Sequence, residues 1–198
     1  MVINKLSVRL LLSARRYSLL LFSCVFLASC SVMPPADFPR EKQVDLPRYM
    51  GAWYVIAHIP PGPTKDSYNS IERYQLNESG EIETVFTYNE GSFEGELKVM
   101  RPKGFSLAQS NGAVWAMQFI WPIKMEYTIS YVDEAYETTI VARSKKDWVW
   151  IMARTPHISE GKYQSLVARV KGLGYSTDKL RKVPQQFLHE RNDLHVRP

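Results

Sequence analysis

Eight short runs of alternating apolar and polar residues, separated by turn-forming residues, constrain the fold of this chain more than any other feature. Such alternation places successive side chains on opposite faces of a strand. Residues 77–80 and 89–91 are rich in Asn and Gly, which accept the positive φ of tight hairpin turns at little cost. The runs are 53–59, 70–76, 81–88, 93–101, 113–120, 125–133, 137–143 and 148–154. The pattern predicts an all-β antiparallel barrel or sandwich.

One amphipathic helix is expected after the last run. Ser159 is a suitable N-cap, and Gly172 and Gly174 provide the stop. A single apolar face repeats at helical spacing, so we expect the helix to pack outside the sheet. That face consists of Tyr163, Leu166, Val167 and Val170. Residues 180–186 are expected to add a short strand, interrupted by Pro184.

A tryptophan and an arginine mark the two ends of the strand series. Trp53 opens the first run just after Gly51, and Arg154 closes the last. We expect the guanidinium to lie over the indole and to seal one end of the barrel, a contact worth roughly 1–2 kcal/mol when desolvated. With Trp53 inward, Val55 and Ala57 are also expected inward.

Alternation also predicts which residues line the interior of the other runs. The sixth run is the clearest, because Tyr127 and its alternate neighbours are apolar whereas Glu126 and Lys124 lie between them. The expected inward residues are Phe93, Leu97, Val99, Trp115, Met117, Phe119, Met125, Tyr127, Ile129, Tyr131, Trp148, Trp150 and Met152. All but Met125 are taken as candidate ligand contacts. An eight-stranded barrel either fills with side chains or holds one small ligand, and both alternatives stay open.

The N-terminal residues indicate export. Lys5, Arg9 and the pair at 15–16 precede an apolar run of about 12 residues, too short to span a bilayer, which needs about 20. The run ends at 27–30, Leu-Ala-Ser-Cys, which resembles the lipobox of bacterial lipoproteins and implies that Cys30 is diacylated. We therefore expect a signal peptide at 1–29, an acylated cysteine with a Pro-rich tether at 30–45, the barrel and helix at 46–186, and a tail at 187–198.

Charge and cysteine content narrow the function classes. Removal of the first 29 of 198 residues leaves 169, and the leader takes four of the 25 basic residues, so 21 bases face 20 acids. This near-neutral balance lacks the excess of basic residues that binding to nucleic acid requires. The same cleavage removes Cys24, so no intramolecular disulfide is expected. No metal-ligand spacing among the histidines, phosphate loop or catalytic motif is present, so neither a cofactor nor an enzymatic function is predicted.

At this point the chain resembles the lipocalin family, and within it the bacterial outer-membrane lipoprotein branch and the apolipoprotein D branch. Three segments in order carry the resemblance: residues 51–54 (Gly-Ala-Trp-Tyr), 133–136 (Asp-Glu-Ala-Tyr) and 154–156 (Arg-Thr-Pro). Residues 93–97 also resemble the fourth-strand pattern of those branches. Val132 and Glu134 depart from the second motif, which usually has Thr and Tyr there. The resemblance implies an eight-stranded up-and-down barrel with a helix packed outside.

The resemblance further implies a calyx for hydrophobic small molecules such as fatty acids or lysophospholipids. The protein is then expected to be a lipid-anchored binding, storage or transport protein of the bacterial outer membrane, with its domain facing the periplasm, as a monomer or homodimer. Ser31 after the anchor, in place of Asp, resembles lipoproteins sorted to that membrane in a Gram-negative host. The alternative is a non-catalytic envelope scaffold whose barrel is filled.

Overall fold

The computed structural model describes residues 32–60, 62–187 and 198. The expected signal peptide at 1–29, Cys30 and most of the expected tail at 187–198 lie outside the described residues. Among the residues described, no helix has both the length and the hydropathy to cross a membrane.

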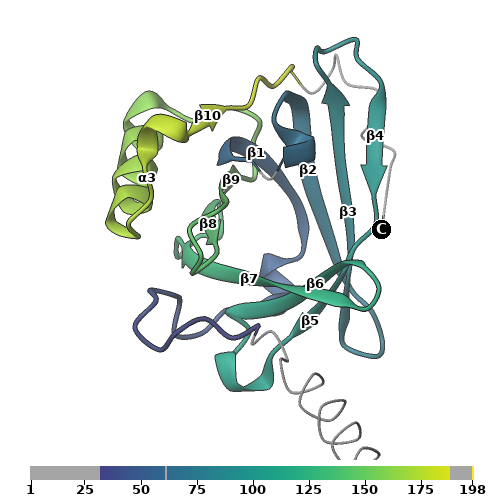
Figure 1. Cartoon of the computed structure of the whole chain (residues 1–198), viewed down its shortest axis with the longest axis vertical. Coiled ribbons are helices and arrows are strands. Elements are labelled where there is room, and N and C mark those ends of the chain that lie inside the picture. The colour runs from purple at the N-terminus through teal and green to yellow at the C-terminus, as the bar shows by residue number, and fades with distance from the viewer. Residues whose placement is uncertain (1–31, 61, 188–197) are drawn as a thin grey trace, which may run out of the picture. The chain divides into compact units, whose positions relative to one another are not determined.

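The strands form one sheet that curls into a closed antiparallel barrel (Figure 1). Strand β9 pairs with β1 and closes the sheet, while β4 and β5 both pair with β3 and together occupy one of eight strand positions. The predicted eight-stranded barrel is confirmed. Its strands are β1 (Gly51–Ile59), β2 (Ser67–Leu76), β3 (Glu81–Glu90), β4 (Leu97–Met100), β5 (Lys103–Ser106), β6 (Val114–Ile120), β7 (Ile123–Val132), β8 (Thr138–Ala142) and β9 (Val149–Ala153).

The fourth strand position differs from the prediction. The sequence predicts one strand over 93–101, but the pairing with β3 breaks after Met100 and resumes at Lys103. Pro102 lies in this gap, and a proline has no N–H to donate to a ladder. Phe93 lies in the turn before β4 and packs edge-on against Tyr68, with ring centroids 5.1 Å apart. Both pieces pair with β3, and β5 also pairs with β6.

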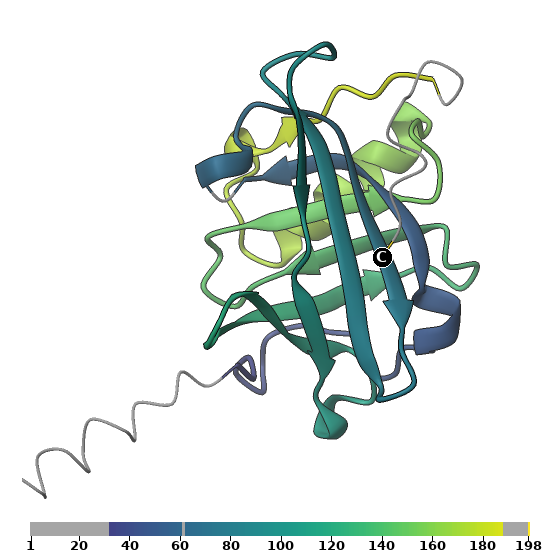
Figure 2. The same ribbon diagram turned by 90° about the vertical axis from the view of Figure 1, so that its right-hand side faces the viewer.

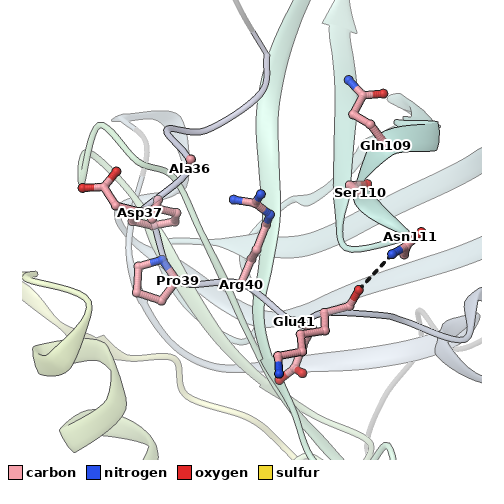
Figure 3. A pocket seen from close by; sticks show the side chains of 10 residues that line it. Ala36, Asp37, Pro39, Arg40, Glu41, Gln109, Ser110 and Asn111 are labelled. Carbon is pink, nitrogen blue, oxygen red and sulfur yellow. Dashed lines mark hydrogen bonds between the residues drawn. The ribbon is translucent and has the colours of Figure 1, made fainter.

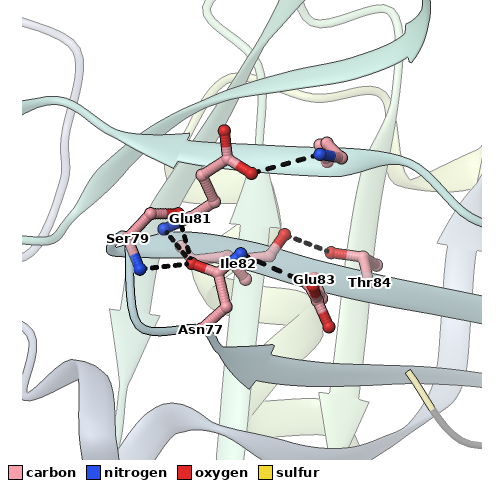
Figure 4. A network of polar contacts seen from close by, with 7 residues as sticks. Asn77, Ser79, Glu81, Ile82, Glu83 and Thr84 are labelled. Carbon is pink, nitrogen blue, oxygen red and sulfur yellow. Dashed lines mark hydrogen bonds and ion pairs between the residues drawn. The ribbon is translucent and has the colours of Figure 1, made fainter.

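The turn between β2 and β3 shows how the hairpins are fixed locally (Figure 4). The side-chain oxygen of Asn77 accepts hydrogen bonds from the backbone N–H of Ser79 at 3.0 Å and of Glu81 at 2.9 Å. Gly80 adopts a φ of 80°, which costs a glycine little. The Asn-rich interruption in the sequence therefore forms the tight turn that the pattern predicts.

The helix packs on the outside of the barrel, as predicted. Helix α3 (Glu160–Gly172) begins after Ser159, whose side chain accepts from the N–H of Lys162. Its buried residues Tyr163, Leu166 and Val170 join an apolar cluster with the outward residues of β1, β8 and β9. Figure 1 places α3 on the side of the barrel away from β3 and β4, and in Figure 2 the β3 and β4 wall faces the viewer. A separate cluster fills the interior.

The segment after α3 completes the wall between β1 and β2. These strands pair at 51–54, but beyond Tyr54 the strand β10 (Arg181–Lys182) pairs with β1 instead. Gln185 then donates from its side-chain nitrogen to the carbonyl oxygens of Val55 at 2.9 Å and Ser70 at 3.1 Å. The short strand expected at 180–186 is present and fills the split between the two strands.

Candidate functional site

An apolar cavity of about 240 Å³ lies inside one end of the barrel. This is the open end, since Thr64 of the β1–β2 connection and Ile120 at the β6–β7 hairpin contribute to its rim. The deeper wall is aromatic and methionine-rich. The full lining is Thr64, Phe86, Met100, Phe119, Ile120, Met125, Trp148 and Trp150.

Most of the predicted interior residues do lie in the interior cluster. Phe119, Met125, Trp148 and Trp150 line the cavity itself, with Trp148 and Trp150 only 4 % and 3 % exposed. Trp150 stacks on Phe86 with ring centroids 5.5 Å apart. The other members of the predicted set pack in the interior below the cavity: Trp115, Met117, Tyr127, Ile129 and Met152.

The predicted inward direction of Leu97 and Val99 is wrong. In antiparallel pairs, residues directly opposite share a face. Phe86 of the interior cluster lies opposite Met100, whereas Val99 lies opposite Thr87 and is 43 % exposed. Leu97 has the parity of Val99. Met100 therefore points into the barrel. Leu97 and Val99, which the alternation predicts to point inward, lie on the outer face of β4.

A β-bulge explains the outward position of Tyr131. The pairing of β7 with β8 shifts register between Ile129 and Tyr131, so the alternation is offset by one residue. Ile129 stays in the interior cluster, while Tyr131 packs with the helix-facing cluster. The guanidinium carbon of Arg169 on α3 lies 4.0 Å from the Tyr131 ring centroid. Tyr131 is thus covered by the helix and does not face the cavity. Phe93, which lies in the turn before β4, does not line the cavity either.

A second bulge, in β1, makes the predicted inward direction of Ala57 wrong. Register shifts between Val55 and Ala57 in the pairing with β9, and Ala57 joins the helix-facing cluster. His58 instead lies opposite Trp150 and therefore points inward. Its side chain is 1 % exposed, and burial, with a further contribution from Arg181, lowers the pKa of His58 to about 4. The imidazole is therefore neutral near neutral pH.

Glu72 is a second buried titratable group that the sequence reading missed. It lies opposite Trp53 on one side and Phe86 on the other, both in the interior cluster, so its carboxyl points into the barrel. The residue is 1 % exposed. Burial raises the pKa of Glu72 well above its ordinary value, and the nearby Arg73 opposes that shift only in part. Assigning Tyr74 inward would have revealed it, because Glu72 shares that face.

The closed half of the barrel is filled by aromatic residues. The hydroxyls of Tyr74 and Tyr127 are hydrogen-bonded, and Tyr49 bonds Thr139 at 3.2 Å. Trp115 stacks on Tyr127 with centroids 5.2 Å apart and an interplanar angle of 10°. Burial raises the pKa of all three tyrosines, so these hydroxyls stay protonated. The interior is thus filled toward the closed end and hollow toward the open end.

Arg154 seals the closed end by covering Trp53. Its guanidinium carbon lies 3.8 Å from the ring centroid of Trp53, whose indole N–H donates to the carbonyl of Tyr49 at 2.8 Å. The guanidinium also donates to the carbonyls of Ala52, Tyr136, Arg48 and Tyr49. Gly51 has a φ of 93°, a conformation that L side chains rarely adopt, so glycine is favoured at this position.

The mouth of the cavity carries an exposed apolar tip. Ile120, Trp121 and Ile123 of the β6–β7 hairpin are 72 %, 82 % and 62 % exposed. Ile120 also lines the cavity, so the apolar surface continues from the interior to the outside. Trp121 is exposed at the mouth, whereas Trp148 and Trp150 in the cavity wall are buried.

Another depression lies outside the barrel, where residues 36–42 meet residues 109–111 (Figure 3). Its volume is about 390 Å³ and its lining is largely polar. Asn111 donates from its side chain to the carbonyl of Lys42 at 3.3 Å across it. It contains none of the predicted ligand residues. Among the described residues no three His, Cys, Asp or Glu side chains gather as a metal site.

Comparison with known proteins agrees with this architecture. The chain is 30 % identical over 151 residues to temperature-induced lipocalin-1 of Arabidopsis thaliana, covering 73 % of this chain and 81 % of that one. It is 26 % identical over 168 residues to outer membrane lipoprotein Blc of Vibrio cholerae, covering 84 % and 97 %.

Among solved structures, insecticyanin from the tobacco hornworm Manduca sexta superposes with a TM-score of 0.61 at 13 % identity, covering 78 % of this chain and 87 % of that one. Lobster apocrustacyanin A1 gives a TM-score of 0.57 at 13 % identity, covering 76 % and 92 %. These matches concern the fold alone. The lipocalin-like domain model matches residues 44–185, which span the barrel, α3 and β10. The chain therefore belongs to the lipocalin family.

Proposed function

We propose that this protein binds a single-chain hydrophobic ligand, such as a fatty acid or a lysophospholipid, in the open-end cavity. The observation that carries the proposal is the contrast between the two halves of the interior. The closed half is packed with aromatic rings, whereas the open half keeps a cavity of about 240 Å³ walled by Phe86, Met100 and Trp150. An apolar cavity is a binding site for apolar groups, because water gains few hydrogen bonds there.

The family supports the same class of function. Lipocalins bind small hydrophobic molecules and are generally non-catalytic binding proteins. Binding rather than catalysis also agrees with the cavity lining, in which Thr64 is the one hydroxyl-bearing residue.

The size of the cavity limits how the ligand is held. Pockets that enclose drug-sized ligands measure about 300–1,000 Å³, so about 240 Å³ encloses only part of a long acyl chain. The remainder of the chain would lie along the apolar tip formed by Ile120, Trp121 and Ile123.

The experiment is a titration of delipidated protein with palmitate and with lysophosphatidylcholine. Binding is expected to quench tryptophan emission, because Trp148 and Trp150 line the cavity. Trp121→Phe separates the signals of the tip and of the cavity: Trp148 and Trp150 remain in that variant, so most of the quenching should persist. No change in emission, together with no lipid extracted from the purified protein, would leave the filled-barrel scaffold as the better account.

We extend the proposal to the location of the protein. Cys30 is the proposed diacylated anchor, with the domain on the periplasmic face of the outer membrane. The support is the Leu-Ala-Ser-Cys sequence at 27–30 and the similarity to an outer membrane lipoprotein of Vibrio cholerae. Cys30→Ala should abolish incorporation of labelled palmitate, with Cys24→Ala as the matched control. Label retained in Cys30→Ala would disprove the anchor.

A further inference from the structure

The inner wall of the barrel carries a row of buried polar atoms that have no hydrogen-bond partner. Seven such side-chain atoms occur in the described part of the chain. Five of them belong to β1, β2 and β9: His58 Nε2, Ser67 Oγ, Ser70 Oγ, Glu72 Oε2 and Trp150 Nε1. Each of these residues is at most 3 % exposed. We call these five residues the polar row.

Strand register places the polar row on the inner face. His58 lies opposite Trp150, and Glu72 lies opposite Phe86, which puts both with members of the interior cluster. Ser67 lies opposite Glu90, which has the parity of the interior residues Phe86 and Tyr88, and Ser70 lies in the register shift of β2 between Tyr68 and Ile71. The row therefore runs along one wall, from Glu72 beside Trp53 toward the mouth.

The polar row meets the lining of the open-end cavity at one of its five residues, Trp150. Trp150 lines the cavity and belongs to the row, and Phe86, the cross-strand partner of Glu72, lines it as well. Buried polar groups in native proteins almost always have a partner, and each one left without costs about 1–3 kcal/mol. A concentration of them along one wall, beside an apolar cavity, is expected where a bound molecule supplies the missing hydrogen bonds.

The chemistry of the row selects the kind of partner. Burial raises the pKa of Glu72 well above its ordinary value and lowers that of His58 to about 4, so burial disfavours the charged form of each side chain. The indole N–H of Trp150 donates, and the hydroxyls, the carboxylic acid and the imidazole offer both donors and acceptors. A cationic headgroup would have to leave water for a wall whose nearby charges, Arg181 beside His58 and Arg73 beside Glu72, are also positive, and an anionic headgroup would still lose its hydration; both are costly. A neutral group that both donates and accepts is the best match.

We propose that the polar row binds the hydroxyl, or the undissociated carboxyl, of a single-chain lipid that enters the calyx with its neutral polar end first. This inference rests on the proposed function, since it requires the same cavity. It specifies that a charged headgroup stays outside the barrel while a neutral one is held inside by His58, Glu72 and Trp150.

The test compares three probes with the same alkyl chain: decanol, decyl methyl ether and decyltrimethylammonium. Only decanol can both donate and accept at its polar end. By calorimetric titration decanol is expected to bind about 3- to 10-fold more tightly than the ether, the equivalent of one net hydrogen bond. The ammonium probe is expected to bind more weakly than either.

Substitutions in the polar row test whether its residues cause the preference for decanol over decyl methyl ether. Glu72→Leu and His58→Phe should each reduce the preference for decanol over the ether toward onefold, while Glu72→Gln, which keeps a donor and an acceptor, should retain it. Ser130→Ala is the matched control, because Ser130 Oγ is also buried without a partner but lies in the β7 bulge. It should retain the preference.

The outcomes separate this inference from the proposed function. Equal binding of decanol and the ether overturns the inference and leaves the proposed function standing. Failure of all three probes, together with failure of palmitate, overturns both. A crystal structure of the decanol complex in which the row contacts only ordered water, with the hydroxyl at the mouth, also overturns the inference.

Discussion

His58 lies directly opposite Trp150 on the inner face of the barrel, because the bulge between Val55 and Ala57 moves it there. Strict alternation from Trp53 would have placed the imidazole outside, in the cluster under α3. Because of the bulge, His58 takes the inward position that strict alternation gives to Ala57. Its imidazole therefore lies opposite Trp150, which lines the cavity. Burial of an ionisable ring in this position makes the stability of the protein depend on pH.

We predict that His58 reduces stability in acid. Its pKa in the folded protein, about 4, lies below its ordinary 6.5, so between these values the unfolded chain binds a proton that the folded chain does not. The contribution of His58 is complete above about pH 6.5 and is lost as the pH falls toward 4, by up to about 3 kcal/mol. Arg181 on β10 is the charged group beside it.

Urea unfolding across this pH range measures the effect. His58→Gln should remove this part of the acid dependence. His157→Gln is the control, because His157 is exposed, and its slope should match that of the unmodified protein. An unchanged slope in His58→Gln would show that the imidazole is not buried in the folded state.

Glu72 is expected to act in the opposite direction. Its pKa is raised in the folded state, so the folded chain keeps a proton that the unfolded chain releases above pH 4.5, and the contribution to stability is lost as the pH rises. The groups facing it are Arg73 and the tyrosines 49, 74 and 127. Glu72→Leu should therefore raise the free energy of unfolding near neutral pH by about 1–3 kcal/mol.

Glu126 provides the contrasting carboxylate. It is also buried, but it accepts from the N–H of Ser144 at 2.8 Å and from the hydroxyls of Ser144 and Thr128 at 2.6 and 2.9 Å. Glu126→Leu should lower the free energy of unfolding by about 1–3 kcal/mol, because these donors lose their acceptor. If Glu72→Leu instead lowered the free energy of unfolding as much as Glu126→Leu does, the carboxyl of Glu72 would have to be hydrogen-bonded in the folded protein. That result would contradict the description of Glu72 as a buried group whose Oε2 lacks a partner.

Arg154→Ala is expected to destabilise the protein by about 2–4 kcal/mol in thermal or chemical unfolding. The change removes the cation–π contact with Trp53 and the guanidinium's hydrogen bonds to four carbonyl oxygens, of which that of Tyr49 keeps the indole N–H of Trp53 as a donor. Arg169→Ala is the control, because Arg169 makes a similar contact with Tyr131 but is exposed on α3. It should cost no more than about 1 kcal/mol. Equal effects of the two changes would contradict a sealing role for Arg154.

The order of strands and the helix could be predicted from the sequence because each depends on local pattern. The Trp53 and Arg154 contact could also be anticipated, since both residues lie at strand ends brought together by closure. Faces beyond a bulge could not be predicted. The bulges in β1 and β7 offset the alternation by one residue, which reversed the expected directions of Ala57 and Tyr131.

The bounds and the inward face of the fourth strand were predicted wrongly for a different reason. Its alternating pattern was real, but Pro102 and the turn containing Phe93 shortened the strand to Leu97–Met100, and pairing with β3 set the opposite face inward. Pro102 was a visible signal for the break. The face of such a short strand depends on its long-range pairing, and the sequence of the strand itself does not contain that information.

The central claim, that the open-end cavity binds the ligand, is tested most directly by a pair of neighbouring substitutions on β4. Met100 lines the cavity, whereas Val99 points outward and is 43 % exposed. Met100→Trp should fill much of the cavity and weaken palmitate binding in calorimetric titration by at least about tenfold, and Val99→Trp should leave it unchanged. Equal palmitate affinity of the two folded variants would contradict the claim.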